Sequence, residues 1–313
     1  MLMVPAYAKV NLALEVTGRR PDGWHDVATV IATIDWHDLV GITATPTTGT
    51  AVTAAPPQRV RLAITGPFAE GVPTGEDNLA ARAATRLLAL AGDPPLTLQV
   101  TLRKEVPSAA GLGGGSADAA AVLRAGAQLL AAHGLPIAQQ ELPALAAELG
   151  SDVPALLAGG TLLATGRGEL LTPLPAAQLH LAVAVAGPSA TAAAYNTLTD
   201  EERTARGSAA ALAAAISSRQ AVDETHLGSA LEPPACRAAP GLRESLDRLR
   251  ALTAGDGHRW HLTGSGGAAF ALTPDAATAT RLAATARAAG FPARACRTVA
   301  ARLGPVAPRP AAG

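Results

Sequence analysis

The distribution of apolar and polar positions predicts several strands in the N-terminal third of the chain. From residue 4 to residue 17 every second side chain is apolar, and the opposite face carries Tyr7, Lys9, Asn11, Ala13 and Glu15. Such alternation is typical of a strand whose two faces meet different surroundings. Further strands are expected in VATVIATIDW, near 60–65 and in LTLQVTLR, the last with Leu96, Leu98, Val100 and Leu102 inside.

The rest of the pattern predicts helices mixed with strands. Helices are expected at about 78–91 and 117–132, in QQELPALAAELG and directly after SDVP, and GTLLATGRGELLTPL is expected to form a hairpin. A second region opens near 178–186, with helices in SAAALAAAISS, GLRESLDRLRALT and ATRLAATARAAG and a strand, glycine turn and strand in RWHLTGSGGAAFAL. Because helices and strands do not alternate strictly, the pattern favours an α+β fold.

Length and charge narrow the classes of protein. The 313 residues are enough for about two domains, and residues 304–313 are expected to form a disordered tail. The 25 basic and 25 acidic residues form no long run of one sign, so we expect neither a nucleic-acid partner nor an anionic membrane surface. The apolar stretches are too short to span a bilayer, and the N-terminus lacks the basic segment of a signal peptide. Cys236 and Cys296 are therefore expected to be buried thiols in a reducing cytoplasm.

Some residue types are rare in this chain. Lysine occurs at positions 9 and 104, and asparagine at 11, 78 and 196, whereas alanine, glycine, proline and arginine are abundant. We interpret this bias as drift toward GC-rich codons, under which a retained rare residue marks a position where no substitute sufficed. Arginine does not replace lysine at a chemical site, so a lone lysine such as Lys9 is a candidate for chemistry.

The segment VPSAAGLGGGSADAAAVL, residues 106–123, contains the clearest motif. A predicted strand precedes its glycines and an alanine-rich helix follows them, and this order is typical of an anion site at a helix N-terminus. The loop is not a Walker A motif, because no Gly-Lys-Ser/Thr follows, and Ser116 stands where a dinucleotide fingerprint requires its last glycine. Phosphate binding is favoured over the alternative, a tight turn with a serine cap.

Four other sites are candidates for chemistry, each with a structural alternative. Asp152 could orient a hydroxyl and accept its proton, or Ser151 or Asp152 could simply cap the next helix. Lys9 and Asn11 share one strand face, which is either catalytic or solvated. Trp24 and His25 could stack on a base and bind its edge, or pack in the core. The turn in LTGSGGAAF, residues 262–270, could approach a phosphate or merely close a hairpin.

These motifs, in this order, resemble the GHMP kinases, which include galactokinase, homoserine kinase and mevalonate kinase. PSAAGLGGGSA at 107–117 is similar to their phosphate loop, and its G-L-G-G-G-S form resembles one branch that acts in the methylerythritol phosphate route to isoprenoid precursors. AYAKVNLALEVTGRRPDGWHDVATV, EDNLAARAA, LGSDVPALLAGGTLLATGRGE and LTGSGGAAFAL resemble further signatures of that branch, so the resemblance runs from Ala6 to about Phe270.

The resemblance implies an enzyme and its reaction. It implies a two-domain fold with the active site in the cleft between domains, an ATP-binding domain at 1–160 and a substrate-side domain at 161–303. The implied reaction is ATP-dependent, Mg²⁺-dependent phosphorylation of 4-diphosphocytidyl-2-C-methyl-D-erythritol at its 2-hydroxyl. Lys9 and Asp152 would be the catalytic pair. The implied ATP contacts are Asn78, Pro107, Ser108, Ala109, Ala110, Gly111, Leu112, Gly113, Gly114, Gly115, Ser116 and Ala117. The implied substrate contacts are Asn11, Trp24, His25, Asp152, Thr191, Tyr195, Gly264, Ser265 and Gly266.

Some positions depart from the branch. Trp24 stands where tyrosine is more common, so stacking is kept while a phenol hydroxyl is lost, and GSALE at 228–232 lacks an expected Asn-Asp. The segment 187–195 is slightly shorter than in that branch, so the substrate roles of Thr191 and Tyr195 rest on a less complete match. Three alternatives remain. A GHMP kinase for a plain alcohol would need no base platform, and a non-catalytic sensor would not need Lys9 and Asp152. A structural or scaffold protein would have no use for the glycine loops.

Overall fold

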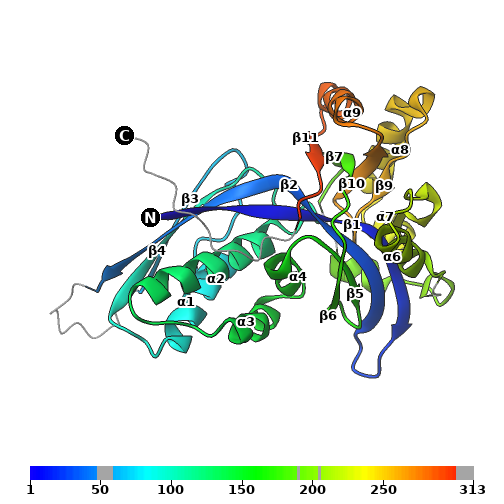
Figure 1. The fold of residues 1–313 in the computed structure, drawn as a ribbon. Coiled ribbons are helices and arrows are strands. Elements are labelled where there is room, and N and C mark those ends of the chain that lie inside the picture. The colour runs from blue at the N-terminus through cyan, green and yellow to red at the C-terminus, as the bar shows by residue number, and fades with distance from the viewer. Residues whose placement is uncertain (48–58, 189–190, 204–205, 301–313) are drawn as a thin grey trace.

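Two long antiparallel strands, β1 (Leu2–Arg19) and β2 (His25–Pro46), run through both parts of the molecule (Figure 1). The structure is a computed structural model that describes residues 1–47, 59–188, 191–203 and 206–300. The expected tail, 304–313, lies outside these residues. Most of β1 is buried, and residues 8–16 are buried without interruption. Both faces of this strand are therefore covered where it crosses the middle of the molecule.

The larger sheet has the strand order β3-β4-β2-β1-β8, with β5 paired to β2 and β6 to β5. Pairing is parallel for β3 with β4 and for β1 with β8, and antiparallel for the other pairs. The additional strands are β3 (Val60–Thr65), β4 (Leu96–Arg103), β5 (Thr161–Thr165), β6 (Leu170–Leu174) and β8 (Gly228–Ser229).

Four helices lie on one side of this sheet (Figure 1): α1 (Leu79–Leu90), α2 (Gly114–Ala132), α3 (Leu142–Leu149) and α4 (Val153–Ala158). Their buried positions form a core with Val40, Ile42, Leu98 and Val100 of the sheet. Helix α2 is rich in alanine and glycine, and Gly126 lies so close to α1 that an added Cβ would be 2.5 Å from Leu87 Cδ1. Small side chains thus let α1 and α2 approach each other closely.

The second sheet has the order β11-β7-β10-β9 and is antiparallel throughout. Helix α9 packs on β7, β10 and β11. The strands are β7 (His180–Val185), β9 (His261–Leu262), β10 (Ala268–Thr273) and β11 (Ala293–Arg297). The helices after residue 190 are α5 (Thr191–Asn196), α6 (Ser208–Ser217), α7 (Glu232–Ala238), α8 (Pro240–Leu252) and α9 (Ala276–Ala288). Short 3₁₀ turns lie at Gln139–Glu141, Glu201–Arg203, Glu224–His226 and Ala254–Asp256.

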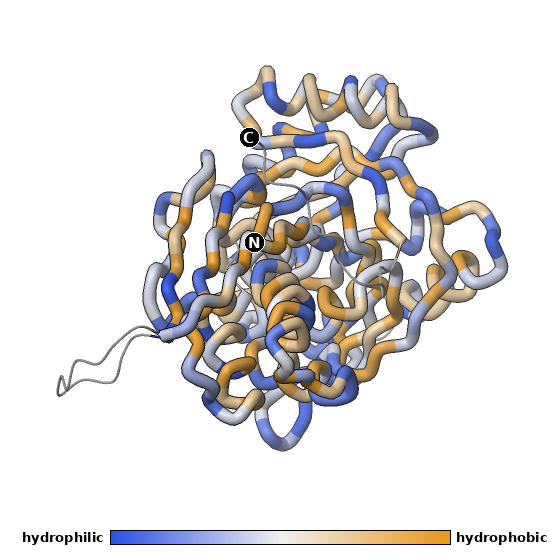
Figure 2. The backbone as a smooth tube through the Cα atoms, turned by 60° about the vertical axis from the view of Figure 1, so that its left-hand side comes forward, coloured by the Kyte–Doolittle hydropathy of each residue, from blue (hydrophilic) through white to orange (hydrophobic). Residues whose placement is uncertain are grey.

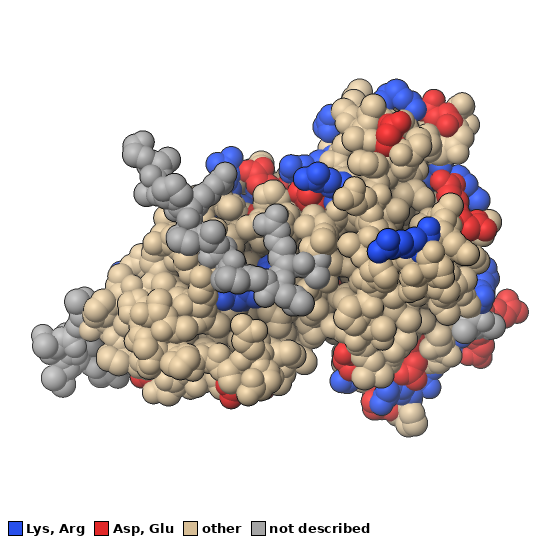
Figure 3. Space-filling view, viewed as in Figure 1, with Lys and Arg blue, Asp and Glu red and all other residues tan. Residues whose placement is uncertain are grey.

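A shared core joins the two sheets. Val10, Leu12 and Ile34 of the larger sheet pack in one cluster with Val183 and Phe270 of the smaller one. Figure 2 shows hydrophobic stretches crossing the interior and hydrophilic ones marking outer loops. On the face in Figure 3, blue and red side chains are interspersed around α8 and α9, whereas the part built on α1 and α2 is mostly uncharged.

The α+β architecture is confirmed, and most predicted strands and helices recur with small shifts of their ends. The strand expected in VATVIATIDW is much longer than predicted, because β2 continues to Pro46. The exposed fractions of Leu96, Leu98, Val100 and Leu102 are 9%, 0%, 1% and 1%, as the alternation predicts. Both cysteines are free and buried. Of the helices in the described segments, none is both long and apolar enough to cross a bilayer. The domain boundary at 160/161 stays a prediction. Three strands that follow residue 160, namely β5, β6 and β8, still belong to the larger sheet.

Candidate active site

The glycine loop connects β4 to α2 and presents the start of that helix to a cavity. Its backbone takes left-handed conformations at Gly111 (φ 74°) and Gly113 (φ 71°), and also at Ala109 (φ 55°). The N-cap of α2 is Gly113, and no described side chain caps the helix. The serine-cap alternative is therefore wrong, since Ser116 lies inside the first turn. The first N–H groups of an α-helix have no partner within the helix, so this uncapped end is suited to an anion.

The loop is held against β1. The backbone N–H of Lys9 donates to the carbonyl of Leu112 at 3.0 Å. A Cβ added to Gly113 would lie 3.1 Å from Lys9 Cγ and 3.2 Å from Leu156 Cδ1. Gly113, the second glycine of the loop, therefore permits both the left-handed turn and the close approach of the Lys9 side chain.

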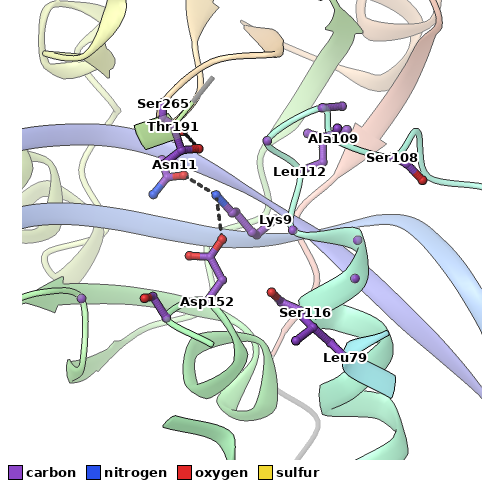
Figure 4. A pocket seen from close by; sticks show the side chains of 18 of the residues that line it. Lys9, Asn11, Leu79, Ser108, Ala109, Leu112, Ser116, Asp152, Thr191 and Ser265 are labelled. Carbon is purple, nitrogen blue, oxygen red and sulfur yellow. Dashed lines mark hydrogen bonds and ion pairs between the residues drawn. The ribbon is translucent and has the colours of Figure 1, made fainter. Parts of the chain in front are cut away.

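Lys9 and Asn11 form the centre of a polar network inside the molecule. The exposed fractions of the two residues are 5% and 4%, so the alternative of a solvated face is wrong. Lys9 Nζ donates to Asn11 Oδ1 at 2.7 Å and lies 3.4 Å from Asp152 Oδ2 (Figure 4). Asn11 Nδ2 donates in turn to Thr29 Oγ1 at 2.8 Å. The amide of Asn11 thus orients the lysine.

The pairing of β1 with β2 is irregular on both sides of these residues. The register shifts between Tyr7 and Lys9 and again between Asn11 and Ala13. β-Bulges of this kind are frequent beside active sites, where they redirect side chains. Here they flank the strand segment that carries the buried lysine.

Asp152 comes from the opposite wall of the cavity. It is the N-cap residue of α4, but its carboxylate makes no capping hydrogen bond and is directed at Lys9 instead (Figure 4). The interpretation of its side chain as a simple helix cap is therefore wrong. The side chain is 41% exposed, whereas that of Lys9 is 7% exposed. The pair thus joins a buried cation to a carboxylate that faces the cavity.

A group of aromatic side chains lies at one end of the cavity. The rings of His25 and Tyr195 have centroids 5.2 Å apart, and the guanidinium of Arg167 lies 5.3 Å from the Trp24 ring. Trp24 is 55% exposed, so packing in the core is excluded for it. Burial, together with Arg203 and Arg19, lowers the pKa of His25, and burial with Asp152 nearby raises the pKa of Tyr195 to about 12. Both groups are therefore uncharged at neutral pH.

The second glycine turn closes the cavity above Asn11. Thr263 Oγ1 accepts from the backbone N–H of Asn11 at 2.6 Å, and Ser265 Oγ lies 2.6 Å from Thr191 Oγ1. Ser229 Oγ donates to the carbonyl of Gly264 at 2.6 Å and accepts from the backbone N–H of Leu231 at 3.1 Å. The departure at 228–232 thus has a structural role, because Ser229 links this turn to β8 and α7.

One cavity of about 980 Å³ brings these parts together. It is lined by all the predicted site residues except Ala117 and Gly266. The N–H of Ala117 is used in α2, where it donates to Gly113, and the N–H of Gly266 donates to Thr263. Asn78 lines the cavity, but its side chain caps α1 by accepting from Ala80 and Ala81 and donates to Pro73.

Some residues of the cavity wall were missed by sequence reasoning. Lys104, Asp118, Arg167 and Thr29 line the cavity beside the predicted residues. The rarity of lysine could have identified Lys104 as well as Lys9. No such signal exists for Arg167, because arginine is common in this chain, or for Thr29, whose hydroxyl bridges Asn11 and the carbonyl of Ala13.

The geometry defines what the site can do. An uncapped helix end offers backbone donors to an anion, a buried ammonium can stabilise developing negative charge, and a carboxylate beside it can receive a proton. These are the parts required for phosphoryl transfer to a hydroxyl group. The aromatic end offers a face and an edge to a planar ligand.

Comparison with known proteins agrees with this geometry. Residues 78–160 match the family described as GHMP kinases N terminal domain. The 4-diphosphocytidyl-2-C-methyl-D-erythritol kinase of Moorella thermoacetica is 39% identical, over 90% of this chain and 94% of the relative, and that of Streptomyces avermitilis is 37% identical, over 98% and 96%. A crystal structure of 4-(cytidine 5'-diphospho)-2C-methyl-D-erythritol kinase superposes with a TM-score of 0.75 at 33% identity, covering 95% of this chain and 99% of the other. The chain belongs to the 4-diphosphocytidyl-2-C-methyl-D-erythritol kinase family of GHMP kinases.

Proposed function

We propose that this protein transfers the γ-phosphoryl group of ATP to the 2-hydroxyl of 4-diphosphocytidyl-2-C-methyl-D-erythritol, giving the 2-phosphate and ADP. The observation that carries the proposal is one cavity that holds an uncapped helix end, the Lys9–Asp152 pair and the aromatic group of Trp24, His25 and Tyr195. The helix end suits the phosphates of the donor, the Lys9–Asp152 pair suits the acceptor hydroxyl, and the aromatic group suits a nucleobase.

The glycine loop binds the phosphates of ATP in this proposal. The backbone N–H groups of Gly113 to Ser116 lie at the positive end of the α2 dipole, where negative charge is stabilised. Neither Gly114 nor Gly115 has a side chain that would keep an oxygen away from these donors. Asn78 contributes by fixing the start of α1 at the cavity edge rather than through a free amide.

Lys9 and Asp152 carry the chemistry. The acceptor hydroxyl loses its proton as its oxygen bonds to phosphorus and the bond from phosphorus to the ADP oxygen breaks. Asp152 orients that hydroxyl and accepts the proton, and Lys9 stabilises negative charge on the attacking oxygen. Because the transition state is loose, positioning and charge stabilisation matter more than the strength of the nucleophile.

The aromatic end recognises the cytosine. Trp24 offers a stacking face, and Tyr195 lies next to His25, with their ring centroids 5.2 Å apart. His25 Nε2 is buried and has no hydrogen-bond partner among the described residues, so the uncharged ring has a free atom for a base edge. Thr191 and Ser265 line the same cavity, with their hydroxyl oxygens 2.6 Å apart.

We propose that Mg²⁺ binds together with the phosphates of ATP. In the described parts of the chain, no group of three or more His, Cys, Asp or Glu side chains could cage a metal ion. This donor set fits an ion held mainly by nucleotide phosphates and water, as is usual for Mg²⁺ in phosphoryl-transfer sites. Bound there, the ion would neutralise charge on the phosphates.

A coupled assay of ADP release tests the proposal. The wild-type protein is expected to release ADP with the cytidylyl substrate and not with mevalonate, homoserine or galactose. Lys9→Ala and Asp152→Ala are each expected to lower kcat by about 10²–10³-fold or more, as is typical when one charge-stabilising group is removed. Asp247→Asn, on the exposed face of α8, is the matched control and should leave kcat unchanged.

Each rival gives a different result in this assay. ADP release with one of the three plain alcohols alone would show another GHMP kinase. Tight binding of ATP and the cytidylyl substrate without turnover would show a sensor. Near-wild-type kcat in Lys9→Ala or Asp152→Ala would contradict the catalytic assignment even if the substrate is right.

A further inference from the structure

A buried cluster of three charged side chains lies directly beneath the glycine loop. Lys104, at the end of β4, donates through Nζ to Asp38 Oδ2 of β2 and, at 2.6 Å, to Asp118 Oδ2 of α2. The exposed fractions of Asp38, Lys104 and Asp118 are 0%, 2% and 2%. Burying ionisable groups costs free energy unless their charges are matched. Here one cation lies between two carboxyl groups, so the charges match only when one of the two carboxyl groups is neutral.

The cluster is joined to both ends of the loop. Asp38 Oδ1 accepts from the backbone N–H groups of Glu105 (2.6 Å) and Val106 (2.8 Å), which lead into the loop. Asp118 lies in the second turn of α2, which leads out of it. A Cβ added to Gly114 would be 3.6 Å from both Lys104 Nζ and Asp38 Oδ2. The three side chains therefore support the backbone that would hold the phosphates.

One atom of the cluster is left without a partner. Asp118 Oδ1 is buried and makes no hydrogen bond to any described residue, although Asp118 and Lys104 both line the cavity. Asp38, in contrast, uses both of its oxygens. Asp118 is thus a buried carboxyl group of the cavity wall with one oxygen that no described residue satisfies.

We propose that Asp38, Lys104 and Asp118 position the glycine loop for ATP, and that the charge on Asp118 sets how tightly the loop holds the nucleotide. The proposal deepens the proposed function and rests on ATP being the donor. With Asp118 neutral, Lys104 and Asp38 balance each other beneath the loop. With Asp118 ionised, the cluster carries a net negative charge next to the triphosphate and opposes its binding.

The surroundings of Asp118 allow this change of charge near neutral pH. Burial, together with Asp38, raises the pKa of Asp118 to about 7, against the opposing effect of Lys104. Burial lowers the pKa of Lys104, but the two carboxylates outweigh it, so the lysine stays charged.

Charged groups on the other elements around α2 do not offset the cluster. Lys9 of β1 is engaged with Asn11 and Asp152. The charged residues of α1 and α3 are exposed to solvent: Arg82, Arg86 and Glu148. Among the described residues, Lys104 is therefore the cation that contacts Asp118 directly.

Calorimetric binding of a non-hydrolysable ATP analogue between pH 6 and 8.5 tests the proposal. Asp118→Asn keeps an oxygen for Lys104 and imitates the neutral carboxyl at every pH. We expect the Kd of the wild type to rise with pH by about five- to tenfold more than the Kd of Asp118→Asn, because one unit of pKa shift corresponds to a tenfold change. Protonation of the analogue itself is the same in both titrations and cancels in the ratio.

The controls separate positioning from general damage. Asp256→Asn, in an exposed ion pair with Arg281, should keep the wild-type profile. In the kinase assay, the wild type and Asp118→Asn should differ in how KM for ATP changes with pH. KM for the acceptor should follow the same pH profile in these two proteins. Lys104→Met should weaken binding at all pH values, but it buries two unpaired carboxylates, so the test does not depend on its folding.

Parallel pH profiles of Kd in wild type and Asp118→Asn, or weaker binding by Asp118→Asn at pH 8, would overturn the proposal. Because the measurement needs no acceptor substrate, it stays valid if the protein phosphorylates a different alcohol. Absence of binding by the wild type would instead contradict the proposed function and this inference together.

Discussion

Lys9 and Lys104 are both buried, but their partners give them different functions. The partners of Lys104 are two buried carboxyl groups, so its ammonium group interacts with the protein and not with a ligand. Lys9 shares its ammonium between Asn11 and Asp152, and the Asp152 side chain is 41% exposed. Lys9 therefore remains available to a ligand in the cavity, which suits it to stabilise charge on a reacting oxygen.

At the same scale, Trp24 is expected to govern affinity for the cytidylyl substrate. Its ring is 55% exposed at the cavity edge and carries Arg167 on its surface. Trp24→Ala should cost about 1–3 kcal/mol of base stacking, seen mainly as a higher KM for that substrate with KM for ATP unchanged. Trp24→Phe is the matched control, because it keeps an aromatic face and should recover much of the affinity. An unchanged KM in Trp24→Ala would show that the base binds elsewhere.

At the scale of elements, the two glycine turns meet directly. A Cβ added to Gly267 (φ +96°) would lie 2.5 Å from the carbonyl oxygen of Ala110 in the phosphate loop. Because the obstacle is backbone, no side-chain rotation relieves it. The hairpin between β9 and β10 is thus built to press against the loop that precedes α2.

Gly267→Ala is therefore expected to displace the loop as well as to strain the turn. We expect a loss of about 3 kcal/mol or more in the free energy of unfolding, from the left-handed conformation and the clash together. Gly134→Ala, at φ +78° with nothing within 4 Å of the added Cβ, is the control for conformational strain alone and should cost about 1–2 kcal/mol. Equal losses in urea denaturation would contradict direct contact between the two turns.

For the whole molecule, the shared core of the two sheets makes stability a common property. Val10 and Ile34 pack with Val183 and Phe270 across the join, and Phe270 is completely buried. We expect Phe270→Ala to cost about 3–5 kcal/mol, the usual range for a buried aromatic residue. Because both sheets contribute to this core, tryptophan fluorescence and far-UV circular dichroism should report one shifted transition. Separate transitions would contradict the shared core.

The dependence of stability on pH also belongs to the whole molecule. Burial lowers the pKa of His261 to about 4, so between about pH 4 and 6.5 the unfolded chain binds more protons there and stability rises with pH. Asp118 acts in the opposite sense, since its pKa of about 7 lets the folded state keep a proton that the unfolded chain loses above about pH 4. The two effects oppose each other over the same range.

Substitution of Asp118 should leave the effect of His261 on the pH dependence of stability unopposed. Asp118→Asn is expected to gain about 2–3 kcal/mol in free energy of unfolding relative to wild type between pH 4.5 and 6.5, because about one proton is no longer lost on unfolding. Urea denaturation at both pH values measures this difference, with Asp256→Asn as the control. A difference that does not change with pH would show that Asp118 is already ionised in the folded protein.

The sequence alone determined the type of most main elements and the chemistry of the loop, whereas the strands β7 and β11 of the second sheet were not predicted. Alternation in LTLQVTLR, the glycines after it and the alanine run behind them are local signals, because each depends on backbone preferences and on neighbouring residues. Lys9, Asp152, Trp24 and His25 were identified from residue type and from resemblance to a family. The tertiary structure decided which of them meet and which alternatives fail: Asp152 does not cap α4, and Asn78 does cap α1.

Contacts between distant segments could not be predicted from the sequence. Asp38 and Lys104 are 66 positions apart, and the hydrogen bond of Asn11 to Thr263 spans 252 positions. No local pattern encodes such a pairing, since it depends on strand order, on the β-bulges around Lys9 and on how closely α2 approaches the sheet. The sequence thus determined the parts of a phosphoryl-transfer site, and the fold decided that Lys104 and Asp118 support it from below, because burial acts on residues that the chain brings together only when folded.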